Sequence, residues 1–120
     1  MARVVAYIPD LLFGSQVQGS LSAAGHEVKL IGGEDGVREA LTGADVLLID
    51  LTDEPARRAG LLRSLPSRDM EGVRTLAFYS HVDVEARRQA ESAGFDLVVP
   101  RSRMAREGAE LVTHLTGEPV

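Results

Sequence analysis

Residues 46–55, VLLIDLTDEP, decide the fold that this sequence predicts. Four consecutive apolar residues, Val46 to Ile49, lead to the carboxylate of Asp50 and then to a polar turn that ends at Pro55. An uninterrupted apolar run of strand length is typical of a central parallel strand that is buried on both faces. In an open α/β sheet, ligands bind outside the carboxyl ends of the strands, where the strand order reverses. Asp50 therefore marks the expected functional edge of the sheet.

Segments with strand character alternate with segments whose apolar residues recur at helical spacing. Glycines and prolines separate these segments at positions where strands and helices commonly end. The expected strands cover residues 3–8, 26–31, 45–50, 73–80 and 95–99, the last ending at Pro100. The expected helices cover residues 11–24, 34–41, 55–65, 83–93 and 105–115, followed by a tail at 116–120.

This alternation predicts an α/β fold with a doubly wound, five-stranded parallel sheet of flavodoxin-like (βα)5 architecture. The common strand order for such a sheet is 2-1-3-4-5, which places the ends of the first and third strands side by side. Asp10 and Asp50 then become neighbours. We expect the whole chain, residues 1–120, to form a single domain.

The composition excludes several classes of function. The net charge of −5 argues against a general surface for nucleic acid or for an anionic membrane. The absence of cysteine excludes disulfides, thiolate catalysis and cysteine-based zinc sites. No apolar run reaches the length of a membrane span and no signal-peptide pattern begins the chain, so we expect a cytoplasmic protein. Among the 13 lysines and arginines, Lys29 is the single lysine.

Three carboxylates and a hydroxyl follow the expected strands at the functional edge: Asp10, Asp50, Asp53 and Ser80. Hard cations such as Mg²⁺ prefer oxygen ligands, so Asp10, Asp50 and Asp53 are candidate metal ligands. With a metal to neutralise charge, an aspartate can attack a phosphoryl donor. Asp is also well suited to turns and helix caps, and this alternative stays open for each of the three.

Three motifs resemble the receiver domains of two-component response regulators. They are the LID run that ends at Asp50 with its polar turn, FYSH at residues 78–81 and AGFDLVVP at residues 93–100. The resemblance extends over nearly the whole chain in the order and length of its elements. It implies a CheY-like signalling domain in which Asp50 is the phosphoacceptor, Ser80 is the switch hydroxyl and Mg²⁺ is the cofactor.

The sequence departs from the receiver pattern at three positions. Receiver domains carry an adjacent acidic pair at the end of the first strand, where this chain has Ile8, Pro9 and Asp10. They carry a lysine at the end of the fifth strand, where this chain has Pro100 followed by Arg101. Their aromatic residue on that strand is replaced by Leu97. Arginine does not reproduce the compact charge of a lysine ammonium. These departures indicate a degenerate, atypical receiver.

We therefore expect a stand-alone pseudo-receiver, not an enzyme, that acts by protein–protein interaction. One alternative is a phosphoaccepting receiver that uses Asp50 with Mg²⁺, and another is a flavodoxin-like domain that binds a small molecule in the same cleft. The expected partner is an acidic protein surface or a second copy of this chain, with no direct role for nucleic acid or membrane. The arginines expected to form this partner surface are Arg87, Arg88, Arg101, Arg103 and Arg106.

Overall fold

The computed structural model describes residues 1–117, which form five strands, five α-helices and one short 3₁₀ helix. The end of the expected tail, at 118–120, lies outside the described residues. No helix within residues 1–117 is both long and apolar enough to cross a membrane. The strands are β1 (Arg3–Tyr7), β2 (Glu27–Ile31), β3 (Val46–Asp50), β4 (Arg74–Tyr79) and β5 (Leu97–Pro100). The helices are α1 (Leu11–Ala23), α2 (Asp35–Ala40), α3 (Pro55–Ser64), α4 (Val84–Ala93) and α5 (Arg101–Leu115), and the 3₁₀ helix is Ser67–Asp69.

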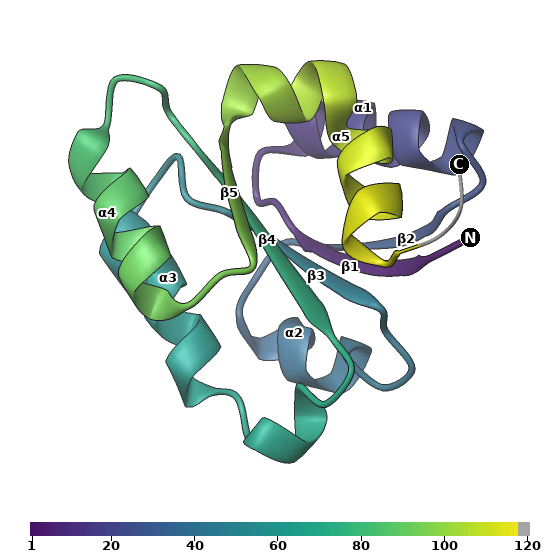
Figure 1. Cartoon of the computed structure of the whole chain (residues 1–120), viewed down its shortest axis with the longest axis horizontal. Coiled ribbons are helices and arrows are strands. Elements are labelled where there is room, and N and C mark those ends of the chain that lie inside the picture. Colours follow the sequence, from purple (N-terminus) through teal and green to yellow (C-terminus); the bar gives the residue numbers. More distant parts are fainter. Residues whose placement is uncertain (118–120) are drawn as a thin grey trace.

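All neighbouring strands pair in parallel, and their order is β2-β1-β3-β4-β5. The predicted fold class and strand order are therefore confirmed. The sheet separates two layers of helices (Figure 1): α1 and α5 cover one face, and α2, α3 and α4 cover the other. Each face of the sheet has its own hydrophobic core.

Strand β3 lies at the centre of the sheet between β1 and β4, and all five of its residues are buried. Val46 and Leu48 pack toward α1 and α5, whereas Leu47 and Ile49 pack toward the other layer of helices. Successive side chains of a strand point to opposite faces, so a strand covered on both sides must be apolar throughout. This requirement explains the uninterrupted apolar run that precedes Asp50.

The structure differs from the predicted boundaries at the C-terminal end of the chain. Helix α5 begins at Arg101, four residues before the predicted start, because Pro100 in an extended conformation leads directly into its first turn. Strand β5 begins at Leu97 because the chain turns at Gly94 and bends at Asp96. The Asp96 carboxylate fixes that turn by accepting hydrogen bonds from the Thr75 amide (2.8 Å) and the Thr75 hydroxyl (3.1 Å).

A buried histidine connects the start of β1 to α5. His26 is 5% exposed, and its Nδ1 accepts a hydrogen bond of 3.1 Å from the Ala2 amide. Its Nε2 lies 3.0 Å from the Thr113 hydroxyl, which donates in turn to the Ala109 carbonyl. Because the Ala2 amide occupies the lone pair of Nδ1, the ring proton belongs on Nε2. The imidazole thus joins Ala2, just before β1, to Thr113 on α5.

We expect His26→Ala to lower the free energy of unfolding by about 1–3 kcal/mol, because it leaves the buried Ala2 amide and Thr113 hydroxyl without this partner. Urea unfolding followed by circular dichroism measures the change. His114→Ala, at an exposed position on α5, is the control and should change stability by less than about 0.5 kcal/mol. Equal losses in the two variants would contradict a specific role for His26.

Candidate functional site

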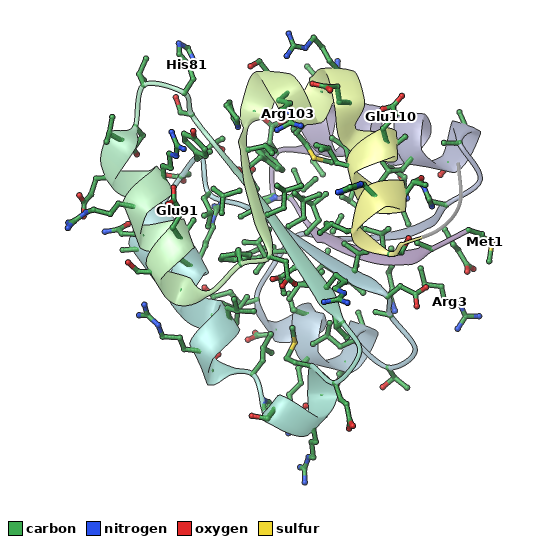
Figure 2. The ribbon with its side chains drawn as sticks, viewed as in Figure 1. Met1, Arg3, His81, Glu91, Arg103 and Glu110 are labelled. Carbon is green, nitrogen blue, oxygen red and sulfur yellow. The ribbon has the colours of Figure 1, made fainter. Side chains whose placement is uncertain are left out.

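The carboxyl ends of β1, β3, β4 and β5 meet at one edge of the sheet. The register pairs Tyr7 with Ile49, Asp50 with Phe78, and Tyr79 with Pro100. The side chains that follow these strands therefore gather at this edge, as predicted for parallel strands. Figure 2 shows His81 here, in the loop between β4 and α4.

The carboxylate of Asp50 is buried and turned into its own loop. Asp50 is 1% exposed. Its Oδ1 accepts hydrogen bonds from the Thr52 amide (2.8 Å) and from the Thr52 hydroxyl (2.6 Å). Hydrogen bonds to a carboxylate compensate for the water that burial removes. One oxygen of the predicted phosphoacceptor is thus already occupied by the residue two positions further along the chain.

The other oxygen of Asp50 faces Arg58, a residue of α3 that the sequence analysis did not single out. Arg58 is 6% exposed, and its Nη1 donates to the main-chain oxygen of Asp50 (3.1 Å) and lies 3.9 Å from Asp50 Oδ2. Its Nη2 lies 3.8 Å from Asp53 Oδ2. Within residues 1–117, Asp50 is the buried carboxylate and Arg58 is the buried guanidinium. They are therefore each other's counter-charge.

The aromatic ring of Tyr7 also contacts Arg58. The guanidinium carbon lies 5.5 Å from the centroid of the Tyr7 ring, within the range of a cation–π contact. Burial raises the pKa of the Tyr7 hydroxyl, and the positive charge of Arg58 acts in the opposite direction. The guanidinium thus contacts an aromatic face as well as the oxygens of the β3–α3 loop.

Asp10 caps a helix and binds a different arginine. Its Oδ1 accepts from the Phe13 amide (3.0 Å) at the start of α1, and its Oδ2 accepts from Arg101 Nη2 (3.3 Å). The Phe13 amide and then Arg101 hold the pKa of Asp10 below its ordinary value. The Arg101 guanidinium also lies 4.0 Å from the centroid of the Phe13 ring. Arg101 therefore reaches from α5 across the edge of the sheet to the first helix.

Ser80 lies on the Arg101 side of this edge. It is half-buried and lines a pocket together with Phe13, His81, Arg101 and Ser102. No hydrogen bond joins Ser80 to Asp50 in the described part of the chain. The roles of Asp50 as phosphoacceptor and Ser80 as switch hydroxyl stay predictions.

The three candidate metal ligands do not share a common centre. Asp10 is directed to α1 and Arg101, Asp50 to Thr52 and Arg58, and Asp53 is an exposed residue near Arg58. Across residues 1–117, no three acidic or histidine side chains are grouped so that they can hold a metal ion. Mg²⁺ requires near-octahedral oxygen coordination, which the three carboxylates cannot supply together while Asp10 faces Arg101 and Arg58 lies beside Asp50 and Asp53.

The five arginines of the expected partner surface lie on α4 and α5. Figure 2 shows Arg103 on α5 and Glu91 on α4. Apart from Arg101, each of these arginines is paired with a glutamate of its own helix, so the surface presents both signs of charge. The pairs are Arg87–Glu91 (2.9 Å), Arg88–Glu85 (2.6 Å), Arg103–Glu107 (3.3 Å) and Arg106–Glu107 (3.7 Å).

No family model matches the sequence, and no curated protein matches it. Solved structures, in contrast, show that the chain has the fold of response regulator receiver domains. The receiver domain of a Francisella response regulator superposes with a TM-score of 0.81 at 13% identity, covering 98% of both chains. The receiver domain of a sensor histidine kinase from Pseudomonas aeruginosa PAO1 has a magnesium ion coordinated in its active-site cleft. It superposes with a TM-score of 0.78 at 12% identity, also covering 98% of both chains.

A third structure belongs to an atypical orphan response regulator whose described regulatory mechanism is independent of phosphorylation. It superposes with a TM-score of 0.75 at 13% identity and covers 96% of this chain and 95% of that chain. Identities at this level establish a shared fold, whereas function depends on the residues of the site.

We expect Asp10→Asn to remove a contribution to stability that the wild-type chain has at neutral pH and loses in acid. Because folding lowers the pKa of Asp10 from its ordinary value of 3.8, the contribution is complete above that value and disappears as the pH falls through the lower folded-state pKa. Asn keeps the helix cap, so the variant isolates the charge. Urea unfolding at about pH 6 and about pH 3 measures the effect. An equal difference between wild type and variant at both pH values would contradict it.

Proposed function

We propose that this chain is a receiver-like signalling domain that acts by protein–protein interaction without phosphorylation. One observation carries the proposal: the carboxylate of Asp50 is buried, and its two oxygens face Thr52 and Arg58. A carboxylate that attacks a phosphoryl donor needs an oxygen that the donor can reach in line. The Asp50 carboxylate instead takes part in internal contacts of the β3–α3 loop.

The other positions of the site support the same proposal. The acid that follows β1, Asp10, is used as a helix cap and as the partner of Arg101. The position where receiver domains carry a lysine is Pro100 or Arg101, and the planar guanidinium of Arg101 lies over the Phe13 ring. The phosphorylation-independent neighbour is a precedent for regulation on this fold without the phosphoryl group.

We place the partner on the arginine surface of α4 and α5 and regard the domain as a binding module, not an enzyme. The arginine–glutamate pairs are exposed, and surface pairs of this kind contribute little to stability, so their exchange for partners in another chain costs little. A second copy of the chain fits such a surface, because an interface with twofold symmetry can set an arginine of one copy against a glutamate of the other.

The second candidate function is a phosphoaccepting receiver that uses Asp50 with Mg²⁺. Two observations favour it: the place of Asp50 at the carboxyl end of the central strand and the magnesium ion in the cleft of the Pseudomonas neighbour. For this function, Asp50 must exchange its contacts with Thr52 and Arg58 for contacts with the metal and the phosphoryl group.

Amide NMR spectra recorded during titration with Mg²⁺ and then with beryllofluoride, a phosphoryl mimic, distinguish the two candidates. We expect no shifts centred on the site at millimolar Mg²⁺, with or without beryllofluoride, because one Asp50 oxygen accepts hydrogen bonds from Thr52 and the other faces the Arg58 guanidinium. Asp50→Asn is the control. Shifts at Asp50, Ser80 and the Asp10 turn that are absent in the control would establish the phosphoaccepting function instead.

A further inference from the structure

Three oxygen atoms surround the guanidinium of Arg58 at the carboxyl end of β3. The main-chain oxygen of Asp50 lies 3.1 Å from Nη1, Asp50 Oδ2 lies 3.9 Å from Nη1, and Asp53 Oδ2 lies 3.8 Å from Nη2. Carboxylate and main-chain oxygens are the ligands that hard divalent cations take in proteins. A side chain from α3 thus carries positive charge into a group of cation-binding oxygens.

Burial makes this arrangement energetically significant. The side chain of Arg58 is 8% exposed and that of Asp50 is 2% exposed, so neither charge is stabilised mainly by water. A buried charge without a counter-charge is strongly unfavourable, and removing one member of a buried pair is correspondingly costly. The two carboxylate distances exceed hydrogen-bond length, and the buried Nε of Arg58 has no hydrogen-bond partner in the described chain. The guanidinium therefore interacts with the two carboxylates mainly through its charge and not through hydrogen bonds.

We propose that Arg58 is a built-in counter-cation, whose guanidinium takes the place beside Asp50 and Asp53 that a divalent metal ion would otherwise fill. The charge of the site is then balanced by the chain itself, and the β3–α3 loop keeps its arrangement without metal. The inference rests on the proposed function, because it takes the carboxyl edge of the sheet as the regulatory site of a phosphorylation-independent receiver. It adds the residue that makes the site independent of metal.

The neighbouring arginine shows that position on the helix, not residue type, creates this role. Arg57 has a side chain that is 66% exposed, and it pairs with Glu34 (3.1 Å) and Glu54 (3.5 Å). Adjacent residues of an α-helix point about 100° apart, so only one of the two can be directed at the sheet. Arg57 and Arg58 thus form a matched pair of substitutions with the same change in charge and different surroundings.

Arg58→Met tests the proposal because it removes the cation and fills the buried space with an uncharged chain of similar length. The Asp50 and Asp53 oxygens then become available to Mg²⁺. We expect the affinity for Mg²⁺, measured by amide NMR titration, to rise by at least about tenfold over wild type. We also expect added Mg²⁺ to raise the thermal midpoint of Arg58→Met but not that of wild type. Arg57→Met should behave as wild type does, and Arg58→Met combined with Asp50→Asn should lose the gain.

Equal Mg²⁺ affinity in wild type and Arg58→Met would overturn the proposal, as would an equal gain in Arg57→Met. If Arg58→Met does not fold, Arg58→Gln is measured in its place. Failure of both variants to fold at any Mg²⁺ concentration also overturns the proposal, because the metal then does not replace the guanidinium. A response of the wild-type chain to beryllofluoride overturns the proposed function instead, because beryllofluoride mimics the phosphoryl group. That result does not change the comparison of Mg²⁺ affinities between wild type and Arg58→Met.

Discussion

The charge balance between Asp50 and Arg58 is the constraint on which the carboxyl edge of the sheet depends. Asp50 follows four buried residues of the central strand, and its carboxylate is itself shielded from solvent at the edge of the sheet. A buried carboxylate needs hydrogen bonds and a counter-charge close by. Thr52 supplies the hydrogen bonds and Arg58 supplies the charge, and both follow Asp50 by eight residues or fewer. The site is therefore completed by the same short segment that leaves the strand.

A second acid–guanidinium pair at this edge connects elements that are distant in the sequence. Arg101 and Asp10 are 91 residues apart, and their contact joins the start of α5 to the start of α1. Arginine can make both pairs because its planar guanidinium contacts a carboxylate and an aromatic ring at the same time, as Arg58 does with Tyr7 and Arg101 with Phe13. A lysine ammonium does not offer that combination, which is consistent with arginine at both positions.

The central strand and the alternation of elements were predictable because they depend on apolar periodicity, which the sequence displays directly. The same reasoning missed the start of α5, because Arg101, Ser102 and Arg103 carry no apolar signal there. It located Asp50 but missed Arg58, since two adjacent arginines look alike until the rotation of α3 about its axis decides which one faces the sheet. Buried ion pairs between neighbouring elements have no sequence period, so only the packed structure reveals them.

The turn between Asp50 and α3 shows why a fixed counter-charge matters. Glu54 has a φ of 45°, and within residues 1–117 it alone among non-glycine residues has a positive φ. A following proline disfavours the right-handed helical conformation, and the left-handed alternative carries strain of roughly 1 kcal/mol or more. The segment is held on both sides: Thr52 bonds to Asp50, and the Arg58 amide donates to the Glu54 carbonyl (3.1 Å). Arg58 therefore contacts both ends of this turn, because its side chain lies beside Asp50 and its amide donates to the Glu54 carbonyl at the start of α3.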